Sequence, residues 1–256
     1  MNNNNITHKM FLSLMIPFIL STITQPLLGA ADIAVVGKLN NVNYISGVSI
    51  GTLIFNTIYW IFGFLRVSTT AFSAQSSHYS DKKRVSDIFF RPIMIALFIS
   101  LIMVIFQNII FESSMKFIKP ELEIEKAAIT YFKILIWGAP FVLTNYVLLG
   151  WLMGLGNIKA SMTMQISGNL LNIILDIIFV TVFNFKVEGV AYATLISQIF
   201  STFLGVYFIF PYTYHKYIDL KSIINKKELI SIFCVNRDLM VRTICLVSHN
   251  NLFTMA

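Results

Sequence analysis

Charged residues are scarce in this chain. They make up 12% of its 256 residues, whereas a soluble domain carries about 25%. Hydrophobic residues reach 56% and the mean hydropathy is +0.74. This composition excludes an ordinary soluble domain. It predicts an all-α, polytopic membrane protein whose helices pack in lipid rather than around one aqueous core.

Cysteine and histidine are also too few to build a site. Cys234 and Cys245 cannot form a disulfide framework or a zinc site, and the four histidines are scattered, so we expect no metal cluster and no cofactor. The first residues, MNNNNITHKM, lack the basic region, short apolar run and cleavage site of a removable signal peptide. We therefore expect the first apolar span to remain in the mature protein.

Six long apolar segments predict six membrane helices, and short polar connections separate them. They run roughly over 11–37, 44–75, 89–110, 127–153, 161–185 and 188–211. Residues 1–211 would thus form one six-helix lobe, and 212–236 a cytoplasmic linker. Residues 237–256 begin a seventh apolar span that is too short to cross a bilayer, which predicts the truncated start of a further helix of a longer parent.

The basic residues lie in the loops, where they act as topology signals rather than as a nucleic-acid surface, despite the net charge of +7. With the N-terminus inside, the inner loops hold Lys82, Lys83, Arg84 and Lys159, and the linker adds more. Inner loops of membrane proteins carry the Lys and Arg excess. We predict a multi-pass protein of the cell (inner or plasma) membrane with a cytoplasmic N-terminus.

Two isolated acids lie within these spans. Asp32 is the sole charged residue between Lys9 and Lys38, and Asp176 stands alone in MTMQISGNLLNIILDIIFVTVF. A carboxylate at membrane depth is costly, so such an acid is a functional-site candidate by default. Two of them predict a protein that handles protons or cations inside the membrane.

Position along the spans places further polar residues at the same depth. Asp32, Asp176 and Thr194 all lie about 8–11 Å below the outer ends of their predicted helices. Asn169, Asn172 and Asp176 follow i, i+3, i+7 spacing and so share one helix face. Their oxygens are hard ligands that suit Na⁺ or a proton-linked water. The alternative is that the amides and hydroxyls only join helices by hydrogen bonds.

Three other residues in the first two spans are notable. Pro17 and Pro26 would kink the helix that carries Asp32, which favours a hinge, although prolines are common in membrane helices. Arg66 would either extend to the inner surface or pair with a buried acid or with backbone carbonyls. Lys133 and Glu188 lie near predicted span ends and are interpreted as interfacial.

Two short motifs have alternative readings. Gly47 to Gly51 (GVSIG) matches the nucleophile elbow of hydrolases, but it opens a membrane helix and no histidine lies in any span. We therefore do not expect an enzyme. Gly150 and Gly154 have the spacing of a helix-packing face; the alternative is that Gly154 and Gly156 end the fourth span.

Several segments resemble one transporter family. They are IPFILSTITQPLLGAADIAVVGKL, FLRVSTTAFSAQ, NYVLLGWLMGLGNIKA, GNLLNIILDIIFV, VEGVAYATLISQ and VNRDLMVRTICL. In order and spacing the chain is similar to the N-terminal half of a multidrug and toxic compound extrusion (MATE) transporter of the DNA-damage-inducible F branch. The resemblance implies the first lobe of a twelve-helix, two-lobe fold, ending inside helix seven.

The resemblance also implies roles for individual residues. Family members export drugs or metabolites in exchange for H⁺ or Na⁺, and their N-lobe cation site matches the four positions Asp32, Asn172, Asp176 and Thr194. Gln25 falls on a polar position that lines the cavity, which Asn169 and Arg66 would also line. Pro17 matches the proline at which helix one is proposed to bend.

These observations leave three functions open. The first is H⁺- or Na⁺-coupled efflux of drugs, organic cations or metabolites. The second is a non-transporting membrane fragment or partner subunit. The third is a lipid or precursor flippase of the same superfamily; the two acids weigh against it because flippases tend to line their cavity with basic residues. The expected partners are membrane lipid, a small-molecule substrate, and a missing C-lobe or a second copy, with no nucleic acid.

Overall fold

A computed structural model describes residues 29, 31–39, 41–76 and 82–212. Helices and turns make up this part of the chain, which contains no β-strand, so the all-α prediction is confirmed. Residues 31–37 form the described end of the first predicted span. The candidates Pro17, Gln25 and Pro26 lie outside the described residues, as do the predicted seventh span and nearly all of the linker.

Five helical runs in the described part are long and apolar enough to cross a membrane. They are Val42–Ser76, Lys82–Ile105, Leu122–Gly154, Ile158–Val182 and Val187–Ile209. These runs agree with predicted spans two to six, because long apolar segments with few charges have one economical structure in lipid, the hydrogen-bonded helix.

Most of these runs are interrupted, and the interruptions define shorter elements. The elements are α2 (Val42–Ile61) and α3 (Phe64–Ser76), α4 (Lys82–Ile105), α6 (Leu122–Leu135), η1 (Ile136–Gly138) and α7 (Ala139–Gly154), α8 (Ile158–Ile177) and η2 (Ile178–Val182), and α9 (Val187–Ile209) with η3 (Phe210–Tyr212). Tertiary packing must support each break, because a break leaves backbone groups without their helical partners.

One predicted connection is itself helical. We expected residues 111–126 to be a loop between spans, but α5 (Gln107–Ile118) occupies half of it and α6 begins at Leu122. The charges concealed an amphipathic helix whose buried face carries Phe111 and Met115, one turn apart. The chain reverses only at residues 119–121, where Lys119 adopts a left-handed conformation and closes α5.

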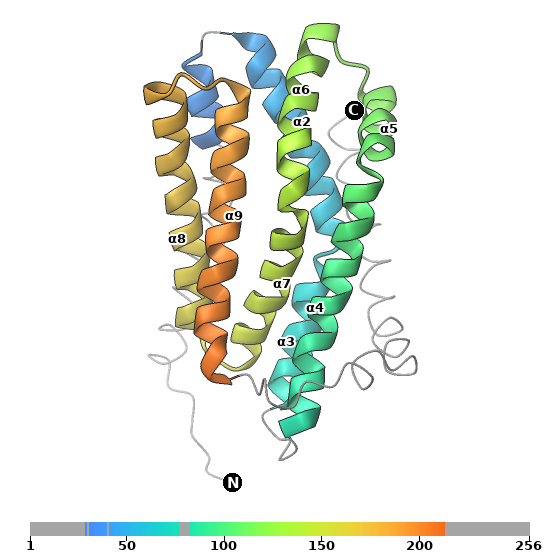
Figure 1. Cartoon of the computed structure of the whole chain (residues 1–256), viewed down its shortest axis with the longest axis vertical. Helices are drawn as coiled ribbons and strands as arrows, with labels where there is room; N and C mark the ends of the chain where they lie inside the picture. Colours follow the sequence, from blue (N-terminus) through green and yellow to red (C-terminus); the bar gives the residue numbers. More distant parts are fainter. Residues whose placement is uncertain (1–28, 30, 40, 77–81, 213–256) are drawn as a thin grey trace, which may run out of the picture.

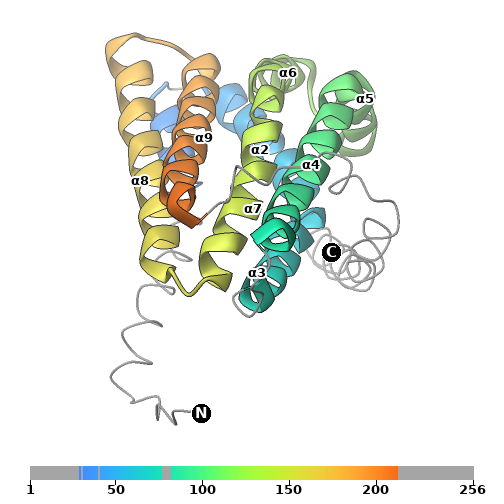
Figure 2. The same ribbon diagram turned by 60° about the horizontal axis from the view of Figure 1, so that its bottom comes forward.

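The helices stand side by side and run between two ends of the lobe (Figure 1). At the upper end lie the turns at 119–121 and 183–186; at the lower end lies the turn at 155–157. By our topology prediction the upper end is the outer one. The two views show α8 and α9 as one antiparallel pair, with α7 placed between α9 and the α3–α4 pair (Figure 2).

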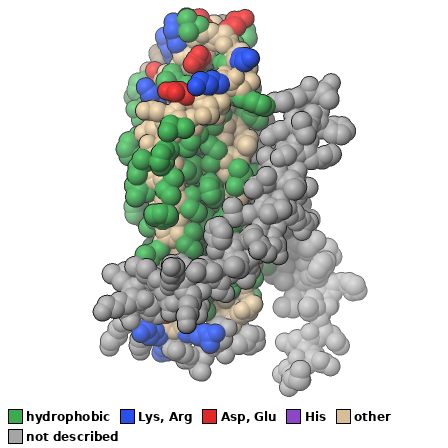
Figure 3. All heavy atoms as spheres, turned by 90° about the vertical axis from the view of Figure 1, so that its right-hand side faces the viewer, with side chains coloured by type: hydrophobic (Ala, Val, Ile, Leu, Met, Phe, Trp, Pro, Cys, Tyr) green, Lys and Arg blue, Asp and Glu red, His purple; other side chains and the backbone are tan. Residues whose placement is uncertain are grey.

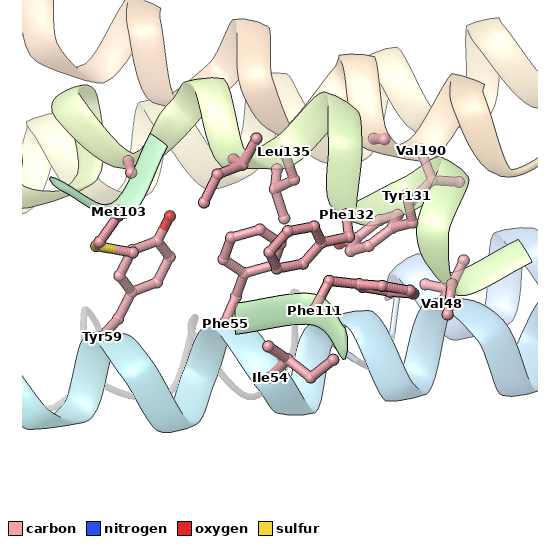
Figure 4. Packing of buried hydrophobic residues seen from close by; sticks show 14 of the residues in the cluster. Val48, Ile54, Phe55, Tyr59, Met103, Phe111, Tyr131, Phe132, Leu135 and Val190 are labelled. Atoms are coloured by element: carbon pink, nitrogen blue, oxygen red, sulfur yellow. The ribbon is translucent and has the colours of Figure 1, made fainter. Parts of the chain in front are cut away.

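Aromatic side chains fill the upper half of the core, between α2 and α6. Phe55 stacks on Phe132 with ring centroids 5.0 Å apart, and Phe111 of α5 lies 5.3 Å from Phe132 (Figure 4). All three are buried. Rings packed in this way hold their helices in a fixed register, since aromatic pairs favour particular geometries.

Glycines allow the closest helix contacts. A Cβ on Gly150 would lie 2.5 Å from the Arg66 carbonyl oxygen, and one on Gly154 would lie 2.5 Å from the Thr70 carbonyl oxygen. The Gly150 and Gly154 pair is therefore a packing face for α3, as the spacing predicted, and α7 also ends at Gly154. The GVSIG motif lies inside α2, where Gly47 packs on Ala127, so it lacks the strand-to-turn geometry of a nucleophile elbow.

Candidate functional site

Three of the predicted residues meet in the upper half of the lobe. Asp32, Asn172 of α8 and Thr194 of α9 are all buried. In the amide orientation that satisfies both of its ends, the Asn172 nitrogen donates to Asp32 Oδ1 at 3.3 Å. Its oxygen then accepts from the Thr194 backbone N–H at 3.0 Å and lies 3.2 Å from the Thr194 hydroxyl. One amide thus joins three helices.

Asp176 completes the group. Its carboxyl is a neighbour of the Asp32 carboxyl, so the two negative charges repel each other when both groups are ionised. The Asp176 side chain is fully buried, and its Oδ1 has no hydrogen-bond partner. Within the described ranges neither carboxyl forms an ion pair with a lysine, arginine or histidine. The structure thus brings Asp32, Asp176 and Thr194 together, as expected from their depth, and adds Asn172 to the group; their role in binding a cation stays a prediction.

The structure adds a residue that sequence reasoning missed. Tyr131 of α6 is 2% exposed, and its hydroxyl accepts a hydrogen bond from Thr52 at 3.5 Å. The same hydroxyl feels the negative charges of both Asp32 and Asp176, so Tyr131 lies in their neighbourhood. Gly51 makes room for the ring, because a Cβ there would lie 2.4 Å from Tyr131 Cδ1. A tyrosine nine residues into an apolar helix, about 14 Å from its end, was the available signal.

Close packing of α8 on α9 holds Asn172 beside Thr194. A Cβ on Gly168 would lie within 2.0 Å of the Ser201 hydroxyl, so the two backbones approach closely there. The Ser197 hydroxyl donates to the Thr194 carbonyl at 2.8 Å. This bond occupies the Thr194 carbonyl within α9, while the Thr194 side chain lies beside Asn172.

An irregular turn follows Asp176 directly. The α-helix ends at Ile177, and residues 178–182 form one π-helical turn. Such turns widen the helix by one residue and occur frequently at functional sites. Here the Phe183 N–H donates to the Ile178 carbonyl at 3.2 Å, which closes the wide turn. The turn fixes the upper end of α8 just above the carboxyl pair.

Two of the suggested cavity residues have different surroundings. Asn169 is half-buried and lies one turn before Asn172 on α8. Arg66 of α3 is half-buried and lies close to Tyr146 of α7, and it forms no ion pair with Asp32 or Asp176. The suggested pairing of Arg66 with one of these two acids is therefore wrong. Arg66 lies on α3, whereas the acid pair is held by the segment 31–37 and α8.

Charge balance defines what this arrangement can do. Among the described residues no lysine, arginine or histidine pairs with these two buried carboxyl groups, and burying uncompensated negative charge is costly. The site must therefore take up positive charge from outside, either as a proton or as a small cation. The oxygens of Asp176, Asp32, Asn172, Thr194 and Tyr131 are the hard ligands that Na⁺ accepts. The described residues contain no cluster of His, Cys, Asp and Glu that could hold a structural metal ion.

Comparison with known proteins places the chain among membrane transporters. The MatE family model matches residues 17–178. Of the curated relatives, the DNA damage-inducible protein F of Escherichia coli (strain K12) is 29% identical over 91% of the chain and 51% of its own length. The multidrug resistance protein MdtK of Klebsiella pneumoniae is 31% identical over 67% of the chain and 37% of its own length. The chain thus spans about half the length, or less, of these curated relatives.

Solved structures agree in fold. A MATE transporter in complex with MaD3S superposes with a TM-score of 0.78 at 26% identity, covering 90% of this chain and 52% of that one. A MOP superfamily transporter from Pyrococcus furiosus, whose binding pocket is described as having reverse polarity, superposes with a TM-score of 0.77 at 25% identity, covering 90% of this chain and 51% of that one. The MATE structure described as bent superposes with a TM-score of 0.75, and the one described as straight superposes with a TM-score of 0.74.

Proposed function

The chain belongs to the MatE family, and we propose that it forms the cation-coupling lobe of a secondary active efflux transporter. In this proposal the lobe takes up H⁺ or Na⁺ at Asp32 and Asp176, in exchange for the outward movement of drugs, organic cations or metabolites. The observation that carries the proposal is the buried carboxyl pair, for which the described part of the chain supplies no counter-ion and no hydrogen-bond partner for Asp176 Oδ1.

The geometry suggests how uptake of a cation would change the packing of the rest of the lobe. Asp32 lies on the segment 31–37, and Asn172 connects it to α8 and α9. A proton or Na⁺ that binds Asp32 changes what its oxygens can accept from Asn172. The segment, α8 and α9 would then shift relative to one another. We keep Pro17 and Pro26 as the proposed hinge, and Gln25 as a proposed contact with the cargo.

Transport by the whole protein needs a second lobe. Relatives about twice this length supply one, and in two-lobe transporters alternating access arises from rocking one half against the other. We propose that the chain works with a C-terminal lobe or with a second copy of itself, in the cell membrane with the N-terminus inside. The alternative is a fragment or partner subunit that does not transport.

The test separates cation binding from transport. In the first part, the purified chain in detergent is titrated with Na⁺ at several pH values, and binding is followed by thermal stability. The variants are Asp32→Asn and Asp176→Asn. The matched control is Asp87→Asn, which alters a buried acid near the lower end of α4, five residues from its first residue. We expect the first two variants, and not the control, to lose their response to pH or Na⁺.

In the second part, the chain is expressed in an efflux-deficient host, alone and together with the C-terminal half of the E. coli relative. We expect drug resistance from the combination and none from the Asp32→Asn or Asp176→Asn combinations. If both variants retain full resistance and full cation dependence, the proposal is wrong. Resistance from the chain alone would favour a homodimer.

A further inference from the structure

A second polar site lies apart from the acid pair, on the side of the lobe formed by α4, α5 and α6. A pocket of about 90 Å³ opens between α5 and α6, lined by Gln107, Asn108, Phe111, Glu112, Ile129, Phe132 and Lys133. A drug-sized ligand needs roughly 300 Å³ or more. The pocket therefore suits a small polar group and is too small to enclose the cargo of a transporter.

The polar side chains of this pocket lack partners. Gln107, Asn108, Glu112 and Lys133 make no side-chain hydrogen bond or ion pair to any other described residue. In particular, Glu112 and Lys133 line one pocket with opposite charges and yet are not joined. Both are exposed, while Phe111 and Phe132 form a buried aromatic floor beneath them.

Helix direction explains why the two charges face one space. Side chains on a helix lean toward its N-terminus. Helix α6 begins at the upper end, so Lys133 leans upward; α5 begins at its lower end, so Glu112 leans downward. We expected Lys133 near a span end, but it lies eleven residues after Leu122, about 16 Å along the helix. A lysine at that depth reaches a polar partner only by extending upward.

The surroundings of the pocket are those of a membrane interface. Figure 3 views the side on which α4 and α5 lie; acidic and basic side chains gather at its upper end, above a broad hydrophobic band. Ile105 and Ile109, which lie one turn apart next to the pocket, are 64% and 59% exposed. A molecule that reaches this pocket therefore has an apolar surface beside it on which hydrocarbon can lie.

We propose that this pocket binds the headgroup of a zwitterionic phospholipid that carries a primary ammonium, as in phosphatidylethanolamine. Lys133 binds the phosphate, with the amide nitrogens of Gln107 and Asn108 as further donors, and Glu112 accepts from the ammonium. The acyl chains lie along Ile105 and Ile109. The occupant matches both charges of the pocket, and the pocket contains no residue of the cation site.

Native mass spectrometry of the purified chain tests the proposal. The probes are the palmitoyl-oleoyl forms of phosphatidylethanolamine, phosphatidylcholine and phosphatidylglycerol. We expect phosphatidylethanolamine to bind about tenfold more tightly than the other two, as one charge-assisted hydrogen bond predicts. Phosphatidylcholine keeps the positive charge but has no N–H to donate, and phosphatidylglycerol lacks the ammonium.

Two variants and two controls locate the effect. Glu112→Gln should remove the preference for phosphatidylethanolamine, and Lys133→Gln should weaken all three lipids about tenfold. Glu123→Gln and Lys126→Gln make the same charge changes in an exposed ion pair of α6 with an N–O distance of 2.8 Å and should change nothing. Equal binding of the three lipids, or equal effects of variants and controls, overturns the proposal.

A second measurement does not depend on variants. Phosphatidylethanolamine with a photoreactive headgroup is added to membranes that contain the unaltered chain, and the labelled peptides are sequenced. We expect labels on residues 107–112 and around Lys133. Labels spread evenly around the upper end of the lobe would show that headgroups do not select this pocket and would also overturn the proposal.

Discussion

The lobe buries acids in two places, and the two places differ in charge balance. Near the lower end, Asp87 is 8% exposed and Arg91, 6% exposed, lies one turn further along α4. Near the upper end, Asp32 and Asp176 are 6% and 0% exposed, and each has the other acid as its charged neighbour. Residues i and i+4 share a helix face, so Asp87 has a protein cation at hand, whereas the acid pair has none.

This difference distinguishes a buried charge that serves the fold from a buried charge that serves the function. An acid with an arginine one turn away on the same helix has an opposite charge nearby that offsets the cost of its burial. Two neighbouring buried acids do not both stay ionised on their own: either one of them takes up a proton, or a metal ion binds between them. The upper site therefore responds to protons and small cations in the solution.

The largest loss of stability should come from removing Arg91, the cation near the lower end of the lobe. Arg91→Met removes the cation one turn from Asp87 on α4, and leaving a buried acid without a nearby cation costs up to about 3–5 kcal/mol. Denaturation of the purified chain in mixed micelles measures this loss. Asp176→Asn is the comparison, because it removes a charge that was never balanced by the protein, and we expect it to be neutral or stabilising. Similar losses for the two variants would contradict the contrast.

A smaller effect should appear in the response to cations. A ligand present at a hundred times its dissociation constant stabilises the state that it binds by about 2.7 kcal/mol. Lowering the pH, or adding Na⁺, should raise the thermal stability of the unaltered chain by up to this amount. Asp32→Asn and Asp176→Asn should abolish the gain. Asp87→Asn should lower the stability of the chain but should still be stabilised by low pH or Na⁺. This outcome distinguishes damage to the fold from damage to the cation site.

Packing near the lower end should affect stability and leave the cation response intact. In Gly150→Ala the added Cβ meets the Arg66 carbonyl oxygen at 2.5 Å, so α3 or α7 must shift. Overpacking of this kind costs about 1–3 kcal/mol. The control is Gly37→Ala, where nothing lies within 4 Å of the added Cβ. A changed cation response in Gly150→Ala would show that the two regions are coupled.

The smallest effect concerns the tyrosine beside the acids. Tyr131→Phe removes a hydroxyl that accepts a hydrogen bond from Thr52, and we expect a loss of about 1 kcal/mol in stability together with weaker cation binding. Tyr59→Phe is a matched control in the same core, since the Tyr59 hydroxyl is buried without a partner. It should be neutral or stabilising. If Tyr131→Phe and Tyr59→Phe behave identically, Tyr131 is not part of the cation site.

The sequence predicted the spans and the depth of the site because both depend on distance along one helix. Asp32, Asp176 and Thr194 could be placed in one layer by counting residues from helix ends. The role of Tyr131 could not be predicted in this way. The buried face of α6 follows helical spacing and includes Tyr131, but periodicity does not say which neighbouring helix that face meets.

Local irregularities were also beyond prediction. Charges at 112–126 indicated a loop, yet Phe111 and Met115 hold α5 against its neighbours. The π-helical turn after Asp176 follows from how η2 packs on α9, and apolar residues such as Ile178 and Val182 give no sign of it. The lipid pocket likewise depends on two helices that converge from different parts of the chain.

The protonation state of the carboxyl pair tests the central claim most directly. Infrared spectroscopy of the purified chain without Na⁺ at neutral pH shows whether a buried carboxyl is protonated, and the Asp176→Asn variant identifies the band. We predict a protonated carboxyl band that is absent in Asp176→Asn, persists in Asp87→Asn, and disappears in the unaltered chain when Na⁺ binds or the pH is raised. Two fully ionised carboxylates at neutral pH without Na⁺ would contradict the account.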